Sequence, residues 1–541
     1  MRICGLKITH DAAVAVVDDG RLLFCWELEK LANDIRHIRM RRLQEVTDVL
    51  AANDIDPQSV DVWSIDGWGD EVAPVTLQLT ESHETVEVAG YREQDEQDAL
   101  RCPGATGAVA LPGACCARYV SYAHSVGHAM SAYATSPFAR RRQSALTLVW
   151  DGGMPPTLYH YDPAATRLRR VGAAGPWFGN LYPDFISHFA PFSGRRAQSD
   201  DPIPYQLSLP GTAMAYAAVG RADPRAHQRL TELLQAGDYG RDAGDELARR
   251  YLSSPSVADD ADVIATFQHA VGELLAERVS KLVAAHGVPR LCLSGGCALN
   301  IGWNTTIRSM TATEIWVPPF PNDSGIAIGV AAAALAARGV HPVLDWDVYA
   351  GPSLLPSAPA PGWAGQRCSE EDLGRFLAHG DEPVVVLHGR AELGPRALGN
   401  RSILAPPWDG MTQRLNDIKG REAFRPVAPI CLEDRASEIF DPGFPDPYML
   451  FVHGIRDAWA DRIPAVCHLD GTARLQTVNS GQNPVVARIL TAFAETTSVP
   501  VLCNTSANAK GRGFFPDARS AMCWGGARHV WCDGTLYTRA D

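Results

Sequence analysis

The chain has 541 residues and a formal net charge of −13, from 62 acidic and 49 basic residues. At roughly 150 residues per domain, this length predicts about two to four domains. A composition of 46% hydrophobic and 21% charged residues is that of a globular protein, and it excludes a disordered, collagenous or coiled-coil chain. The acidic excess argues against a nucleic-acid partner, because proteins that bind DNA or RNA usually carry a basic excess.

The most apolar stretch, Gly325 to Gly339, predicts a buried helix rather than a membrane span, which needs about 20 residues. The N-terminal residues contain no apolar run of signal-peptide length. The 13 cysteines are odd in number and form no CxxC pair, which argues against a disulfide framework or a zinc motif. We therefore expect a reduced, cytoplasmic protein without a membrane partner. The sequence does not indicate an oligomeric state.

The first part of the chain alternates strands, helices and Gly-rich turns, which predicts an α/β domain. A helix is expected over 261–285 from its helical spacing of apolar residues, and a second over the apolar stretch just described. Asp18-Asp19-Gly20 predicts a hairpin turn. The predicted strands are 3–6, 13–17, 22–26, 60–65, 145–150, 157–161, 290–293 and 314–317.

Residues 343–365 are rich in Pro, Gly, Ser and Ala and predict an interdomain linker. Beyond it few long helical patterns occur, so an α+β domain is expected. Its predicted strands are 383–387, 427–432, 449–452, 499–503 and 530–537. We therefore predict two domains, residues 1–345 and residues 366–541, and no internal repeat is visible in the sequence.

A candidate metal site combines His124 and His128 with Asp151 and Asp323. Histidines at i and i+4 lie on one face of a helix and can share a metal. Asp151 ends an apolar strand and Asp323 begins a helix, so two imidazoles and two carboxylates suit iron, manganese or zinc. Two histidines satisfied by ordinary hydrogen bonds explain the spacing equally well, and Asp323 alone could be a helix N-cap.

Two further motifs of the first domain lie in turns. His10-Asp11 follows the first strand and is compatible with a phosphate-facing loop or with an ordinary polar turn. Gly295-Gly296 ends a strand before a helix that starts near Asn300, which lets the backbone approach a nucleotide or simply makes a tight turn. The sequence contains neither GxGxxG nor a Walker A motif.

The second domain concentrates cations beside Gly and Pro at strand ends, a pattern typical of a small anion site. Arg binds phosphate through its planar fork of donors and Lys adds a point charge. Solvated surface arginines are the alternative. The motifs contain Arg396, Lys419, Arg425 and Arg474, and a polar Asn504-Thr505-Ser506 run follows them.

These motifs, taken in order, resemble the NodU/CmcH carbamoyltransferase family over nearly the whole chain. The resemblance implies an actin-like ATPase (ASKHA) first domain and a YrdC-like second domain. It implies that the second domain makes carbamoyl adenylate from carbamoyl phosphate and ATP. The first domain would then transfer the carbamoyl group to a hydroxyl of a small natural-product precursor, such as that of an antibiotic.

The resemblance also implies roles for individual residues. His10 and Asp11 would be catalytic, and Fe(II) or another divalent metal would lie on His124, His128, Asp151 and Asp323. Mg²⁺ would accompany ATP. The nucleotide loop would be Gly295, Gly296 and Asn300, and the residues that hold carbamoyl phosphate and the adenylate would be Arg396, Lys419, Arg425, Arg474 and Ser506.

The chain departs from the family pattern at three places. One follows Asn504-Thr505-Ser506, where the family's usual Phe-Asn and acidic turn become Ala507-Asn508-Ala509-Lys510-Gly511-Arg512. The acidic run after the first hairpin, a region that helps to build the acceptor pocket in the family, reads Glu27-Leu28-Glu29-Lys30, with Ile35-Arg36-His37 after it. Thr212 stands where the family has a Lys.

Two other hypotheses stay open. One is a metal-dependent ATPase or sugar kinase on the same actin-like core, which would release ADP and would not need the second-domain arginines. The other is a nucleotide-binding regulatory protein, which would show no turnover with carbamoyl phosphate.

Overall fold

The computed structural model describes residues 1–69, 72–82, 84–101, 103–112, 117–194, 202–237, 240, 242–254 and 258–540. The chain divides into two compact units, and each is described by itself. The first unit consists of residues 1–28 and 37–350, and the second of residues 29–36 and 351–541. The predicted linker, 343–365, spans the division at residue 350, whereas nothing in the sequence predicted that residues 29–36 belong to the second unit.

The first sheet of the first unit has the strand order β3-β2-β1-β4-β8-β7. β1 to β3 form an antiparallel meander, whose predicted turn at Asp18-Asp19-Gly20 is confirmed and has Gly20 at φ +81°. β4 pairs parallel to β1, and β8 parallel to β4. The strands are β1 (Arg2–Lys7), β2 (Ala13–Asp18), β3 (Arg21–Glu27), β4 (Val62–Asp66), β7 (Ala105–Val109) and β8 (Ala117–Tyr122).

The second sheet repeats this plan in the order β11-β10-β9-β12-β13. β9 to β11 are antiparallel, and β12 and β13 continue in parallel from β9. The unit therefore contains a structural duplication that the sequence does not show by eye, because strand pairing depends on apolar pattern rather than on residue identity. This α/β duplication agrees with the predicted actin-like fold. The strands are β9 (Ala145–Val149), β10 (Thr157–Asp162), β11 (Arg167–Ala173), β12 (Arg290–Ser294) and β13 (Glu314–Trp316).

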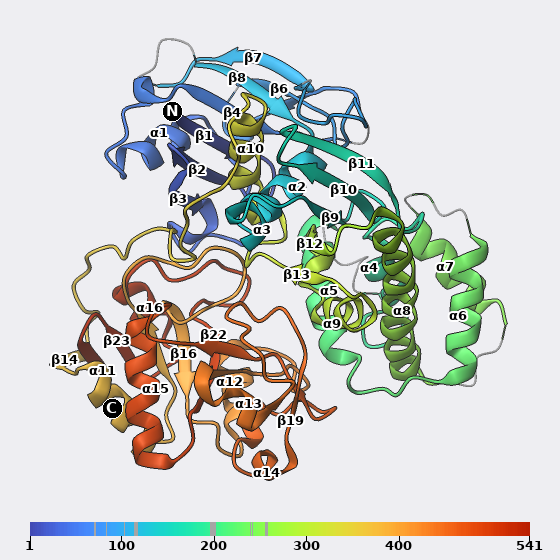
Figure 1. Ribbon diagram of the computed structural model, residues 1–541. Helices are drawn as coiled ribbons and strands as arrows, with labels where there is room; N and C mark the ends of the chain where they lie inside the picture. Colours follow the sequence, from blue (N-terminus) through green and yellow to red (C-terminus); the bar gives the residue numbers. More distant parts are fainter. Residues whose placement is uncertain are drawn as a thin grey trace. The chain divides into compact units, whose positions relative to one another are not determined.

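Two buried helices, α2 (His124–Ala134) and α10 (Ile326–Ala336), form the core of the first unit. α10 packs on β1, β2 and β4, α2 packs on β9 and β12, and the two helices pack on each other (Figure 1). They approach so closely that a Cβ on Gly329 would lie 1.9 Å from the carbonyl oxygen of Gly127. Glycine at this crossing therefore sets the distance between the two sheets.

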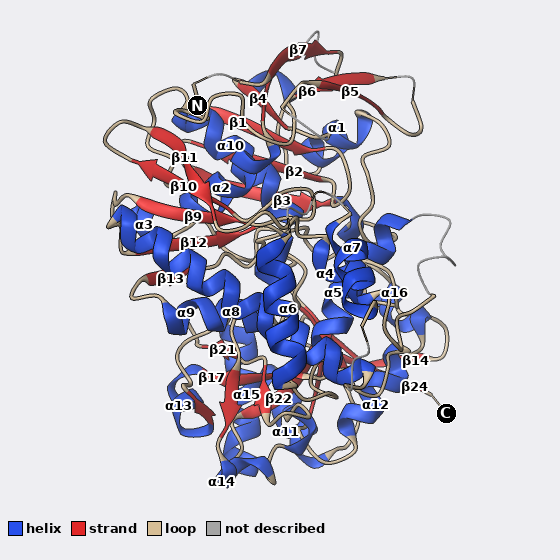
Figure 2. Ribbon diagram, turned by 90° about the vertical axis from the view of Figure 1, so that its right-hand side faces the viewer, coloured by secondary structure: helices blue, strands red, loops and turns tan. Residues whose placement is uncertain are grey.

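The remaining helices of the first unit include a cluster of α4 to α8, whose members pack on one another (Figure 2). The predicted helix over 261–285 is confirmed as α8. None of the described helices combines the length and apolar character needed to cross a bilayer. These helices are α1 (Gln44–Ala51), α3 (Pro137–Arg140), α4 (Leu181–Ile186), α5 (Pro202–Tyr216), α6 (Pro224–Ala236), α7 (Ala243–Leu252), α8 (Asp260–His286) and α9 (Ile301–Met310). Two further strands, β5 (Val75–Gln78) and β6 (Thr85–Val88), pair with each other as an antiparallel hairpin outside the two sheets.

The second unit is built on a mixed eight-stranded sheet of order β14-β24-β23-β15-β16-β22-β17-β21, which confirms the predicted α+β class. β18, β19 and β20 form a smaller sheet. The strands are β14 (Trp363–Arg367), β15 (Val384–Leu387), β16 (Arg401–Ala405), β17 (Ala428–Leu432), β18 (Phe440–Asp441), β19 (His453–Ile455), β20 (Thr472–Ala473), β21 (Gln476–Val478), β22 (Val501–Ser506), β23 (His529–Cys532) and β24 (Thr535–Arg539).

Helices of the second unit cover this sheet, and α11 packs against α15. The helices are α11 (Glu370–His379), α12 (Met411–Lys419), α13 (Ala436–Ile439), α14 (Asp457–Ala460), α15 (Pro484–Thr497) and α16 (Ala518–Trp524). The predicted strand over 449–452 is wrong, because the N–H groups of Leu450 and Phe451 bind the Asp446 carboxylate and the strand begins only at His453.

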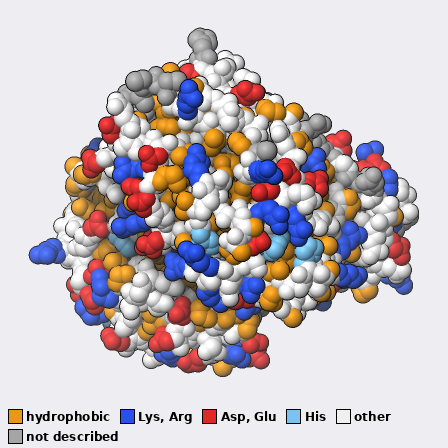
Figure 3. Space-filling model, turned by 45° about the horizontal axis from the view of Figure 1, so that its top comes forward, with side chains coloured by type: hydrophobic (Ala, Val, Ile, Leu, Met, Phe, Trp, Pro, Cys, Tyr) orange, Lys and Arg blue, Asp and Glu red, His pale blue; other side chains and the backbone are white. Residues whose placement is uncertain are grey.

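Acidic and basic side chains of the described residues are interspersed on the face drawn in Figure 3.

Replacing Gly329 by Ala should lower the free energy of unfolding by about 1–3 kcal/mol, because the added methyl group overpacks the α2–α10 crossing. Urea unfolding measures the change. Gly211→Ala on α5 is the control, since no atom of the described residues lies within 4 Å of its added Cβ and Ala favours a helix by up to ~1 kcal/mol. Equal effects of the two substitutions would contradict the packing argument.

Candidate functional site

The four predicted metal ligands come together in the first unit. His124 and His128 lie in the first two turns of α2, Asp151 follows β9, and Asp323 immediately precedes α10. One ligand atom from each residue lies within 4.8 Å of the others. The packing of α2 against α10 therefore converts three distant sequence segments into one cluster of two imidazoles and two carboxylates.

The cluster has the free donor atoms that a metal needs. The Nε2 atoms of His124 and His128 lie 3.5 and 3.4 Å from Asp323 Oδ1, and both are buried without a hydrogen-bond partner in the described structure. Burial by itself raises the pKa of the Asp151 and Asp323 carboxyls, but the neighbouring cationic side chains hold both below their usual range. Two ionised carboxylates and two imidazole nitrogens fit Fe(II) or another divalent metal.

Two residues that the sequence interpretation missed surround this cluster. Asp66 accepts a hydrogen bond from His124 Nδ1 at 2.9 Å, which leaves Nε2 as the ring atom available to bind a metal. The buried Lys7 ammonium lies 2.8 Å from Asp66 and 2.9 Å from Asp323. A signal for Asp66 existed, because it ends a predicted strand as Asp151 does, whereas Lys7 has no distinguishing pattern.

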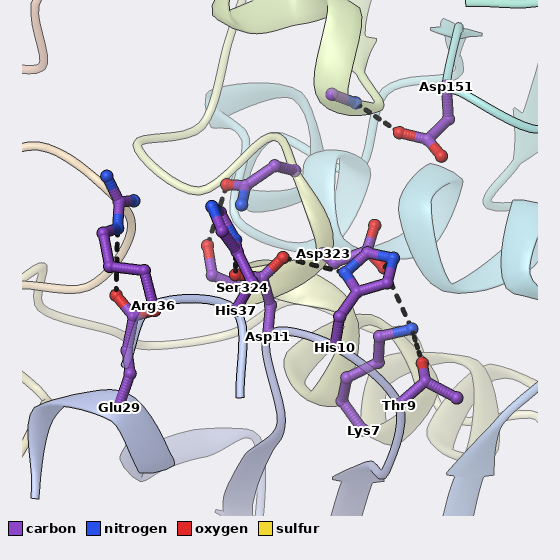
Figure 4. A network of polar contacts seen from close by, with 12 residues as sticks. Lys7, Thr9, His10, Asp11, Glu29, Arg36, His37, Asp151, Asp323 and Ser324 are labelled. Carbon is purple, nitrogen blue, oxygen red and sulfur yellow. Dashed lines mark hydrogen bonds and ion pairs between the residues drawn. The ribbon is translucent and has the colours of Figure 1, made fainter. Parts of the chain in front are cut away.

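His10 and Asp11 form a dyad in the loop after β1 (Figure 4). His10 Nδ1 lies 3.0 Å from one Asp11 oxygen, and His37 Nδ1 lies 2.8 Å from the other. These two imidazoles hold the pKa of the Asp11 carboxyl well below its usual range, although burial alone raises it. His10 Nε2 faces Asp323 Oδ2 at 3.5 Å. The loop thus orients one imidazole toward the metal-type cluster, and His37 is a member that the sequence did not indicate.

The Gly295-Gly296 turn also borders the cluster. Gly295 has φ +91°, and a Cβ there would lie 2.2 Å from the Trp150 carbonyl oxygen, so only glycine fits. The N–H of Gly296 donates to Asp151 at 2.6 Å. Asn300 caps α9 through the Trp303 N–H and pairs with the amide of Gln268. Its role in nucleotide binding stays a prediction.

The predicted anion-binding residues gather in the second unit, from four separate segments. Arg396 lies between β15 and β16, Lys419 ends α12, Arg425 precedes β17, and Arg474 lies between β20 and β21. Arg421 joins them, and its guanidinium donates to Thr505 Oγ1 at 3.0 Å. We call Arg396, Lys419, Arg421, Arg425 and Arg474 the cation group.

The members of the cation group repel one another. Burial and neighbouring arginines lower the pKa of Arg396 to about 10 and that of Arg421 to about 9. Burial, Arg396 and Arg425 hold the pKa of Arg474 well below its usual value, and its buried Nε has no hydrogen-bond partner in the described structure. Glu422 and Asp446 act in the opposite direction on the pKa of Arg421, Arg425 and Arg474, but burial and the neighbouring cations outweigh them. Such a group fits a polyanionic ligand.

Other polar side chains position the loops of this site. The Lys419 ammonium donates to the Ser506 carbonyl at 2.7 Å and to the Asn508 side chain at 2.6 Å, and Ser506 Oγ binds the same Asn508 oxygen. The buried Glu392 carboxylate accepts the N–H groups of Leu398, Asn400 and Arg401, which shapes the loop that carries Arg396.

Arg401 lies in the same motif as Arg396, but its guanidinium binds backbone carbonyls. Its guanidinium is buried and donates to the carbonyls of His388, Asn400, Pro352 and Gly389. This arginine is therefore structural. The sequence could not separate it from Arg396, because both lie in the same Gly-rich motif.

Two family models match the chain. The carbamoyltransferase N-terminus matches residues 2–333, and the carbamoyltransferase C-terminus matches residues 376–528. The chain belongs to the carbamoyltransferase family. The predicted family and the prediction of a carbamoyltransferase enzyme are thereby confirmed.

Curated relatives of this carbamoyltransferase align over nearly its full length. Nodulation protein U of Bradyrhizobium diazoefficiens is 43% identical and covers 100% of this chain and 97% of its own. The 3'-hydroxymethylcephem-O-carbamoyltransferase of Amycolatopsis lactamdurans is 33% identical and covers 95% of this chain and 94% of its own.

Solved structures resemble the carbamoyltransferase more distantly. HypF of T. kodakarensis covers 62% of this chain and 47% of its own, with 13% identity and a TM-score of 0.35. The activator of the 2-hydroxyisocaproyl-CoA dehydratase of Clostridium difficile covers 64% of this chain and 100% of its own, with 13% identity and a TM-score of 0.34.

Removing a ligand or its orienting partner should release the metal. We expect His128→Ala to abolish stoichiometric binding of anaerobically added Fe(II), and Asp66→Asn to weaken it about 10- to 100-fold. Metal analysis after gel filtration measures both. His227→Ala is the control, since that exposed imidazole pairs with Glu273 away from the cluster. A wild-type protein that binds no divalent metal, or a His128→Ala variant that binds it normally, would contradict the assignment.

Proposed function

We propose that the chain is an ATP-dependent O-carbamoyltransferase with two reaction sites. The second unit makes carbamoyl adenylate from carbamoyl phosphate and Mg²⁺-bound ATP, and the first unit transfers the carbamoyl group to a hydroxyl. The observation that carries this proposal is the cation group, because a transferase that handled only neutral ligands would not need five half-buried or buried cations in one place. Membership of the carbamoyltransferase family supports it.

The step in the second unit consumes and releases phosphates. Water cleaves the phosphoryl group from carbamoyl phosphate, and inorganic phosphate leaves. A carbamate oxygen then attacks the α-phosphorus of ATP, and pyrophosphate leaves as carbamoyl adenylate forms. Arg396, Arg425 and Arg474 provide fork-shaped donors for phosphate oxygens. Ser506, whose hydroxyl donates to Asn508 in this structure, is the further residue proposed to bind the phosphate. Lys419 holds the loop that bears Ser506, as its hydrogen bonds indicate.

The step in the first unit is an acyl transfer. The acceptor hydroxyl attacks the carbamoyl carbon, its proton moves to His10 Nε2, and AMP leaves. Asp11 fixes His10 in the tautomer with the proton on Nδ1, so that Nε2 carries the lone pair. A base so placed contributes about 10²- to 10⁴-fold to the rate. Gly295 and Gly296 provide a tight turn beside the site for the nucleotide.

His124, His128, Asp151 and Asp323 would hold the divalent metal. When bound, it supplies Lewis-acid stabilisation of the charge on the departing phosphate. Asp66 and Lys7 orient the side chains of His124 and Asp323.

The acceptor is proposed to be a small hydroxylated natural-product precursor, such as that of an antibiotic. A relative is named for O-carbamoylation of 3'-hydroxymethylcephem, which supports a hydroxyl as the acceptor group.

Purified protein with ATP, Mg²⁺ and carbamoyl phosphate should release pyrophosphate and phosphate. Addition of an acceptor from a panel of hydroxylated metabolites should produce AMP and an acceptor heavier by one carbamoyl group, detected by mass spectrometry. Release of ADP instead would favour an ATPase or sugar kinase. Absence of any carbamoyl-phosphate-dependent turnover would favour a nucleotide-binding regulatory protein.

Two variants should separate the reaction sites. His10→Ala should lower carbamoyl transfer by about 10²- to 10⁴-fold while pyrophosphate release continues, because adenylate formation needs only the second unit. Arg474→Ala should lower pyrophosphate release by at least about tenfold, because a charge-assisted hydrogen bond to phosphate is lost.

Arg488→Ala is the matched control for Arg474→Ala, since the exposed Arg488 side chain pairs with Glu370. His188→Ala, which removes a pair with Asp245, is the control for His10. A folded His10→Ala variant that loses pyrophosphate release, or keeps normal transfer, would refute the role given to His10.

A further inference from the structure

Residues 29–36 lie far from the cation group in sequence but belong to the same unit. Their backbone is bound to the loop that follows Ser506. The Arg36 N–H donates to the Gly511 carbonyl at 3.0 Å, and the Gly513 N–H donates to the Asp34 carbonyl at 2.8 Å. A Cβ on Gly513 would lie 2.0 Å from the Glu29 carbonyl oxygen, so the loop and the segment are in close contact.

The same segment also holds the loop that carries Arg396. The ammonium of the buried Lys30 donates to the carbonyls of Glu392 at 2.8 Å and Gly394 at 2.7 Å. Residues 29–36 therefore contact two of the loops that supply the anion-binding residues. Lys30 fixes the backbone of the loop that carries Arg396.

Arg36 is the cation that this arrangement presents to the site. Its Nε lies 3.7 Å from Glu29 Oε1, and 37% of its side chain is exposed (Figure 4). The charge of Arg36 contributes to the lowered pKa of Arg396, Lys419, Arg421 and Arg425, as burial does. A guanidinium whose charge acts on all four of these cations lies close to the cation group, despite its contact with Glu29.

We propose that Arg36 is a substrate-binding residue of the second unit and contacts a phosphate group of the ligand held by the cation group. The partial exposure of Arg36 leaves its guanidinium accessible to a ligand from solvent. Which phosphate it binds, that of carbamoyl phosphate or the triphosphate of ATP, rests on the proposed function. The proposal that Arg36 binds a phosphate anion is independent of the proposed function.

The test uses the full chain and the variants Arg36→Ala and Arg36→Lys. We expect Arg36→Ala to weaken binding of inorganic pyrophosphate or phosphate, measured by calorimetry, by about tenfold or more, as loss of one charge-assisted contact predicts. Arg36→Lys should recover part of the affinity, since it restores the charge without the fork. Arg367→Ala, which removes an exposed arginine from the edge strand β14, is the control and should bind as wild type does.

Steady-state kinetics of pyrophosphate release show which substrate carries the phosphate group that Arg36 binds. A raised KM for carbamoyl phosphate alone assigns Arg36 to that substrate, and a raised KM for ATP alone assigns it to the triphosphate. Unchanged anion affinity together with unchanged KM values would overturn the proposal, as would a lower kcat alone. A third outcome separates the two proposals. If the wild-type protein binds pyrophosphate and Arg36→Ala does not, but neither protein releases pyrophosphate from ATP, then Arg36 is a phosphate-binding residue and the proposed function is wrong.

Discussion

The crossing of α2 and α10 at Gly127 and Gly329 is the constraint on which the first unit depends. Each helix packs on a different sheet, so their separation fixes the distance between the two sheets. His124 and His128 start one helix, and Asp323 precedes the other. A larger residue at the crossing would therefore disturb packing and the geometry of the polar cluster together. The helix contact therefore affects both the stability of the unit and the positions of its polar side chains.

The two units bury charge in opposite ways, and this difference suits different chemistry. In the first unit, imidazoles and Lys7 alternate with carboxylates, so the charges compensate and each side chain is oriented by a neighbour. In the second unit, like charges gather and lower one another's pKa. The first arrangement is ready to hold a cation and move a proton, whereas the second requires an anion to reduce its repulsion.

The N-terminal hairpin shows how local and long-range information differ. Its strands and its Asp-Asp-Gly turn follow from alternation and from the positive φ that Gly20 accepts. The segment after it, 29–36, has no such pattern, and its place in the second unit comes from hydrogen bonds with residues almost 500 positions later, such as that between Arg36 and Gly511. The prediction of a strand at 449–452 was wrong for a related reason. The N–H groups of Leu450 and Phe451 donate to the buried Asp446 carboxylate instead of to the carbonyls of a neighbouring strand.

The sequence by itself determined the α/β and α+β classes, about half of the strands and the main candidate residues, because apolar periodicity and ordered motifs are local properties. It could not distinguish the structural Arg401 from Arg396, nor find Asp66, Lys7 and His37 as partners of the first-unit site. Only the tertiary structure decided these, and it also placed residues 29–36, with Arg36, in the same unit as the cation group. The physical reason is that hydrogen bonding and charge repulsion depend on distances in space, which chain folding sets between residues far apart in sequence.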